Sequence, residues 1–134
     1  MKIVMDTNIF ISAFYWGGNP QKIIDRIIEG LDELYISNEI LNEIASVMTR
    51  SKFKTSPEII ERYIKTIEKI GKKVFITGKI KGICRDKDDD SIIECAALCG
   101  ADYLITGDDD LLILKIYQDI KIITVKDYIN LIAF

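Results

Sequence analysis

The chain has 134 residues, of which 49% are hydrophobic and 29% are charged, a balance typical of one globular domain and not of a disordered segment. Its formal net charge is −3, so overall positive charge does not explain any binding of nucleic acid. No apolar run approaches the roughly 20 residues that cross a bilayer. The apolar start of the chain meets an acid at Asp6 and is too short for a secretory signal, so we expect a cytoplasmic protein.

Histidine is absent from the sequence, which narrows the possible chemistry. Ser-His-Asp and Cys-His hydrolases, histidine-dependent ribonucleases and HExxH metalloproteases are all excluded. The sequence has three cysteines, an odd number without the spacing of a disulfide framework, which argues against a disulfide-stabilised scaffold. Carboxylates or lysines must therefore carry any catalysis.

Hydrophobic periodicity predicts alternating strands and helices along the whole chain. In the first half we expect a strand at 2–5, a helix at 8–14, a helix from Asn19 or Pro20 to Glu29, a strand at 33–36 and a helix from Ser37 or Asn38 to 48. In the second half we expect a helix at 57–70, a strand at 73–76, a helix at 88–99, a strand at 102–105, a helix at 109–114, a strand at 120–123 and a helix from Thr124 or Lys126 to 131. The alternation indicates a parallel sheet between helical layers, in a single domain spanning 1–134.

Two acids directly follow predicted strands. Asp6 ends the first strand, and Asp108 follows the fourth strand after Thr106 and Gly107. In an open α/β sheet, ligands bind at the carboxyl ends of the strands, where the strand order reverses. Both acids are therefore expected to project into one site.

The run Asp86–Asp90 places four acids in five residues at the start of a predicted helix. Capping and the helix dipole account for one or two of them. The excess suggests a cation, and hard carboxylate oxygens suit Mg²⁺ or Mn²⁺. The run is not an EF-hand, because Ser91 and Ala97 stand where that loop needs Gly and a bidentate Glu.

Four stretches of the sequence match a known family in order and spacing. They are residues 5–10 (Met-Asp-Thr-Asn-Ile-Phe), 37–44, 85–96 and 101–112. Together they resemble the PIN-domain ribonucleases, and among them the VapC-like toxins of prokaryotic toxin–antitoxin pairs. The resemblance implies a three-layer α/β/α sandwich with a five-stranded parallel sheet. It also implies Mg²⁺- or Mn²⁺-dependent cleavage of single-stranded RNA.

The resemblance assigns metal-binding acids of the active site by position. Asp6, Glu43 and Asp108 are three of them. On spacing alone Glu43 would be a solvated surface acid at the edge of its helix, so its assignment depends on the resemblance. The remaining acid is Asp89 or Asp90. Counting back from Ala96 in the family pattern favours Asp89, whereas counting back from Thr106 favours Asp90. Both are retained, with a preference for Asp89.

Three further residues are expected to support these acids. Asn8 would orient Asp6 or a metal-bound water, and Thr106 would line the site. Asp110 would either contact the metal-binding acids without binding the metal itself or cap a helix. Family members often have Pro where this chain has Lys87, a departure that affects the loop and not the ligands.

The resemblance also implies partners. These are single-stranded RNA as substrate, a cognate antitoxin protein and a second copy of the chain in a homodimer. The apolar residues proposed to contribute to the homodimer are Phe14, Tyr15 and Trp16. The cations proposed to contact the RNA backbone are Arg50, Lys52 and Lys54.

Two other functions fit parts of the pattern. In an aspartate-dependent phosphohydrolase Asp6 would be the nucleophile, but such enzymes need a second Asp where this chain has Asn8. A PIN-fold module that only binds RNA or protein would not need every acid position to be filled, and here all are filled.

Overall fold

The computed structural model describes residues 1–133, and the last residue of the predicted domain lies outside this range. Its centre is one sheet in the order β3-β2-β1-β4-β6-β5. The strands are β1 (Lys2–Met5), β2 (Glu33–Ser37), β3 (Gly71–Val74), β4 (Tyr103–Ile105), β5 (Ile116–Tyr117) and β6 (Ile120–Ile123). All neighbours pair in parallel except β5, which is antiparallel to β6 at the edge.

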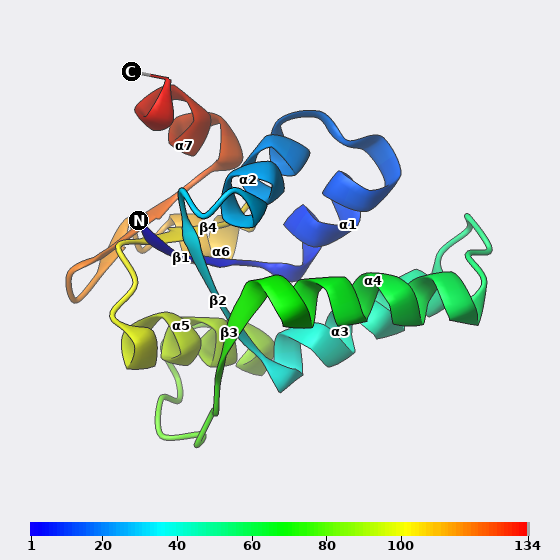
Figure 1. The fold of residues 1–134 in the computed structure, drawn as a ribbon. Coiled ribbons are helices and arrows are strands. Elements are labelled where there is room, and N and C mark those ends of the chain that lie inside the picture. Colours follow the sequence, from blue (N-terminus) through cyan, green and yellow to red (C-terminus); the bar gives the residue numbers. More distant parts are fainter. Residues whose placement is uncertain (134) are drawn as a thin grey trace.

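Helices cover both faces of this sheet. They are α1 (Thr7–Trp16), α2 (Gly18–Ile28), α3 (Asn38–Arg50), α4 (Pro57–Ile70), α5 (Lys87–Cys99), α6 (Asp109–Leu112) and α7 (Val125–Ile132). Figure 1 shows α5 on one side of the strands and α1, α2 and α7 on the other, with α3 and α4 side by side. The predicted three-layer α/β/α fold is confirmed.

The central strands are buried on both faces, as a parallel sheet between helices requires. In β1, Ile3, Val4 and Met5 are fully buried, and in β4 Leu104 and Ile105 are at most 1% exposed. Each of these short apolar strands leads within a few residues to a polar residue that caps the next helix. The buried core residues of each strand are therefore followed directly by polar residues at the strand end.

The strand order reverses between β1 and β4, which lie side by side although about 100 residues separate them. The register pairs Met5 with Ile105, and the backbone N–H of Asp6 donates to the Ile105 carbonyl at 3.1 Å. The residues following both strands therefore emerge at the same point. This is the position where open α/β sheets bind ligands.

The observed elements agree with the predicted ones to within two residues at each end, and one strand was not predicted. Strand β3 is Gly71–Val74 where 73–76 was expected, α2 begins at Gly18 where Asn19 or Pro20 was expected, and α6 ends at Leu112 where residue 114 was expected. The two-residue strand β5, Ile116–Tyr117, was not predicted and makes the sheet six-stranded. The five parallel strands are those expected.

Within residues 1–133, the structure contains no helix whose length and apolar character would allow it to cross a membrane.

Gly71 offers a direct test of the packing between β3, β2 and α4. A Cβ at this position would lie 3.0 Å from Ile36 Cγ2 and 3.2 Å from the Ile67 carbonyl oxygen. Because buried neighbours and a backbone atom must shift, we expect Gly71→Ala to lower the free energy of unfolding by about 1–3 kcal/mol. Chemical denaturation would measure the change.

The matched control is Gly107→Ala, where a Cβ meets nothing within 4 Å. This variant should unfold within about 0.5 kcal/mol of the parent. Equal stability of the Gly71→Ala and Gly107→Ala variants would contradict the close approach of β3 to Ile36.

Candidate active site

Asp6 lies at the centre of the site and is held from two sides. It caps α1, with Oδ1 accepting the backbone N–H of Asn8 at 2.8 Å. Its Oδ2 accepts the Thr106 hydroxyl at 2.6 Å. The carboxylate is 6% exposed and Thr106 is fully buried. Asp6 is therefore fixed in position by a backbone group of α1 and by the side chain that follows β4.

Thr106 links Asp6 to the acids that follow β4. Its Oγ1 donates to Asp6 and also accepts the backbone N–H of Asp108 at 3.0 Å. Asp108 in turn caps α6, and its Oδ1 accepts the backbone N–H of Asp110 at 2.8 Å. One hydroxyl thus sets the spacing between Asp6 and Asp108.

Asp89 completes an acidic cluster from the opposite helix, α5. One carboxylate oxygen each of Asp89, Asp108 and Asp110 lie within 4.8 Å of one another, and no other acid trio in residues 1–133 is as close. Asp89 is 6% exposed. Its burial, together with the negative charges of Asp108 and the neighbouring acids, raises the pKa of Asp89 to about 7.

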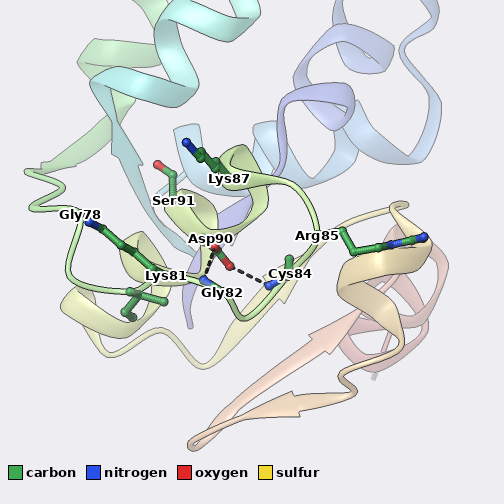
Figure 2. Close-up of a pocket in the computed structure, with 9 residues that line it drawn as sticks. Gly78, Lys81, Gly82, Cys84, Arg85, Lys87, Asp90 and Ser91 are labelled. Carbon is green, nitrogen blue, oxygen red and sulfur yellow. Dashed lines mark hydrogen bonds between the residues drawn. The ribbon is translucent and has the colours of Figure 1, made fainter.

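Asp90, the adjacent residue, points elsewhere. Its two oxygens accept the backbone N–H groups of Gly82 at 2.9 Å, Ile83 at 3.1 Å and Cys84 at 2.8 Å. Figure 2 shows the carboxylate directed into the loop that precedes α5. The side chain is 6% exposed, and three donors satisfy most of its acceptor capacity. The structure thus separates the two acids that the sequence left as alternatives.

Glu94 is a buried acid that the sequence analysis did not single out. It lies one helical turn beyond Asp90 and accepts the backbone N–H and hydroxyl of Thr77 and the N–H of Ile80. Burial alone would raise the pKa of Glu94, but these donors outweigh it and lower the pKa. In the sequence, the sign of this buried carboxylate was an acid standing among apolar residues of the helix, next to Ile93.

Glu43 of α3 lies at the edge of the cluster. Its side chain is half-buried, and a hollow of about 100 Å³ beside it is also lined by Glu39, Asp88 and Ser91. Burial raises the pKa of Glu43, and the charges of Asp88 and Asp6 add to the effect. Glu43 is therefore near Asp6 in space but outside the closest trio.

The supporting residues also have defined positions. Asn8 is exposed and contacts Asp6 through its backbone, while its side chain lines a separate hollow beside Thr106. Asp110 is half-buried, and its Oδ1 accepts Arg85 Nη2 at 2.7 Å. Arg85 was not predicted and is the cation in contact with the cluster.

The basic stretch proposed for RNA lies away from these acids. Arg50 ends α3, and Lys52 and Lys54 lie in the connector to α4, at the far end of this helix pair in Figure 1. Lys52 lies over the ring of Phe53, 5.7 Å from its centroid. Of the three apolar residues proposed for a homodimer, Trp16 is 67% exposed, whereas Phe14 and Tyr15 are half-buried.

The donor set fits a divalent cation of the hard type. The acids that approach one another offer only carboxylate oxygens, the ligands preferred by Mg²⁺ and Mn²⁺. Burial, and after it the negative charges of Asp108 and the neighbouring acids, raise the pKa of Asp89, so part of the shift reflects repulsion between the acids. A cation at this point would relieve that repulsion.

The PIN domain family matches residues 2–110, which include all of these acids. The chain belongs to the PIN-domain family. It is therefore a nuclease by family, with an acidic cluster of the kind that binds divalent metal.

Two individual proteins are similar to this PIN domain. An uncharacterized protein of Methanocaldococcus jannaschii is 36% identical over 118 residues, which cover 86% of this chain and 76% of the relative. A chain in the crystal structure of VapBC2 from Rickettsia felis, bound to a DNA fragment from their promoter, superposes with a TM-score of 0.67. That match covers 92% of this chain and 98% of the other at 16% identity, so it is a likeness of fold.

The neighbouring acids Asp89 and Asp90 should respond oppositely to removal of their charge. The folded-state pKa of Asp89 is about 7, above its ordinary value of 3.8, so Asp89 costs stability as the pH rises from about 4 to above 7. We expect Asp89→Asn to raise the melting temperature of metal-free protein at pH 8 and to change it less at pH 5. Asp90→Asn should lower the free energy of unfolding at both pH values by about 1–3 kcal/mol, because an amide nitrogen would face a backbone donor.

Thermal and chemical unfolding in the presence of a chelator would measure both variants. Asp119→Asn, at an exposed position in the turn between β5 and β6, is the control for loss of a negative charge. If Asp89→Asn destabilised the protein at pH 8 as much as Asp90→Asn, Asp89 would also be an anchoring residue and not a repelled one.

Proposed function

We propose that this PIN domain is an endoribonuclease that cleaves single-stranded RNA with bound Mg²⁺ or Mn²⁺. The observation that carries the proposal is the convergence of Asp89, Asp108 and Asp110 beside the buried Asp6. The absence of histidine from the sequence leaves carboxylates or lysines as the groups able to organise hydrolysis, and carboxylates are the groups that converge here.

The proposed metal-binding acids are Asp6, Asp89 and Asp108, with Glu43 at the edge of the site. Asp90 keeps its place among the candidates from sequence, but its three backbone donors favour a role in holding the preceding loop. A bound divalent cation would supply Lewis-acid polarisation of the scissile phosphate and lower the pKa of a water molecule.

The chain's own residues prepare this site. Thr106 fixes Asp6 and the start of α6 together, so these acids need little rearrangement to receive a cation. With its pKa raised to about 7, Asp89 would be partly protonated near neutral pH, and binding of a cation would displace that proton. Arg85 offsets the charge of Asp110, which limits the repulsion that an approaching phosphate meets.

The biological role proposed by resemblance is that of the toxin in a toxin–antitoxin pair, in the cytoplasm. A cognate antitoxin and a second copy of the chain are the proposed protein partners. The likeness in fold to a chain of the Rickettsia felis VapBC2 structure supports this proposal. The exposed ring of Trp16 supports a protein contact at the end of α1.

Removal of one central carboxylate tests the nuclease proposal. We expect Asp6→Asn and Asp108→Asn each to lower the rate of single-stranded RNA cleavage in Mn²⁺ by at least about 100-fold, because even residues behind metal ligands cost 10–100-fold when removed. A chelator should abolish cleavage by the parent, and added Mn²⁺ should restore it. Gel analysis of an end-labelled oligonucleotide would measure the rates.

Asp119→Asn again supplies the control and should cleave at the parental rate. Calorimetric titration with Mn²⁺ alone adds a readout independent of cleavage, and its affinity should fall in both site variants. Unchanged cleavage by Asp6→Asn would exclude the proposed mechanism. RNA binding without cleavage by the parent would instead support a module that only binds.

A further inference from the structure

The loop between β3 and α5 has no regular secondary structure but is firmly anchored. Glu94 accepts donors from its first part, at Thr77 and Ile80, and Asp90 accepts three consecutive backbone N–H groups from its last part. Glu94 and Asp90 are 2% and 6% exposed. Buried carboxylates that accept backbone donors hold a segment more strongly than neutral hydrogen bonds do. The loop is therefore pre-organised.

This loop and the first turns of α5 enclose a pocket of about 480 Å³. Figure 2 shows the loop passing around α5, with Asp90 between them. The walls include Ile80, Cys84 and two glycines, Gly78 and Gly82. Both glycines have positive φ angles, +78° and +74°, which let the backbone follow the pocket wall. The volume lies within the range of pockets that bind small organic groups.

The polar groups around this pocket are mainly cationic. Lys81, Arg85 and Lys87 line it, and the lining acid, Asp90, has its charge directed to backbone donors. Burial and the nearby acids raise the pKa of Cys84 to about 11, so this thiol stays neutral and adds no charge. A ligand with a small organic body and an attached anion matches such a pocket.

Arg85 joins this pocket to the acidic cluster. Arg85 is one of the residues that line the pocket; its side chain points away from Gly78 and Lys81 in Figure 2 and donates to Asp110 at 2.7 Å. A strand whose phosphate lies at the cluster would therefore place a neighbouring nucleotide at the pocket.

We propose that this pocket binds one nucleotide of the RNA strand next to the scissile phosphate, with the base between the loop and α5 and its phosphate at Lys81 and Lys87. The inference rests on the proposed action on single-stranded RNA. It assigns the basic contact to the β3–α5 loop and the start of α5, in place of the remote Arg50, Lys52 and Lys54.

Binding of a fluorescein-labelled RNA nonamer in the presence of a chelator tests the pocket without cleavage. We expect the double variant Lys81→Gln/Lys87→Gln to raise Kd about tenfold at low salt. The slope of log K against log salt should become shallower by about 0.7, because the variant no longer neutralises the one phosphate that both lysines contact, and each neutralised phosphate of a single strand adds about 0.7 to the slope. Fluorescence anisotropy at several salt concentrations would give both values.

The matched control is Lys65→Gln/Lys69→Gln on the exposed side of α4, with the same change in charge. It should leave Kd and the salt slope at parental values. Thermal unfolding of both double variants would verify their folding.

Oligonucleotides that lack the base at one position in turn test the base contact. The affinity of the parent protein should fall when the base is missing at one particular position of the strand, and at no other. The amide NMR resonances of Gly78 and Gly82 should shift when the intact strand is added, but not when the strand lacking that base is added. Equal behaviour of the two double variants, or no sensitive position, would overturn the pocket proposal even if the parent cleaves RNA. A parent that binds in this pattern but fails to cleave with Mn²⁺ would overturn the nuclease proposal and leave the pocket standing.

Discussion

The parallel pairing of β1 with β4 is the constraint on which the site depends. It joins two segments about 100 residues apart and places Asp6 beside Thr106, whose hydroxyl then sets the position of Asp108. Burial of Asp89 and, after it, repulsion from Asp108 and the neighbouring acids raise the pKa of Asp89, which is a cost of this arrangement. The fold can maintain the arrangement because the strands on either side are apolar and buried. The stable core thus sustains a locally unfavourable charge cluster, a common property of functional sites.

Helix α5 divides its acids between two tasks. Successive residues of a helix differ by about 100° in direction, so Asp89 and Asp90 cannot face the same neighbour. Asp89 faces the acids after β4, whereas Asp90 and Glu94, four residues apart on one face, both accept backbone donors from the β3–α5 loop. The same turn of helix therefore builds the acidic cluster and anchors the loop beside it. A change in this helix would affect both.

The sequence predicted the elements with strong periodicity and missed those decided by tertiary contacts. The helix at 57–70 and the strand at 120–123 agree with α4 and β6 at both ends. Strand β5 was missed because it depends on positive φ angles at Lys115 and Gln118, which composition does not reveal. Strand β3 begins two residues earlier than expected, at Gly71, whose lack of a side chain permits the close approach to Ile36. The strand topology predicted where the acids that follow the strands would lie. The sequence could not separate Asp89 from Asp90, because they are chemically identical neighbours. Only the position of the loop distinguishes them, and the metal-binding roles of these acids remain proposals.

The net charge of −3 raised the question of how an acidic chain could act on RNA, and the distribution of charge gives an answer. Lys81 and Arg85 of the β3–α5 loop and Lys87 at the start of α5 line the pocket beside this loop, and Arg85 also forms an ion pair with Asp110 of the acidic cluster. A polyanion approaching the metal-free cluster meets repulsion, because several carboxylates lie in a partly buried site where water screens them weakly. A divalent cation reverses the local field without changing the protein's overall charge. Recognition of the strand and its chemistry would then depend on two separate sources of positive charge, one from the chain and one from the bound ion. This separation explains why an overall acidic composition does not argue against a nucleic-acid substrate here.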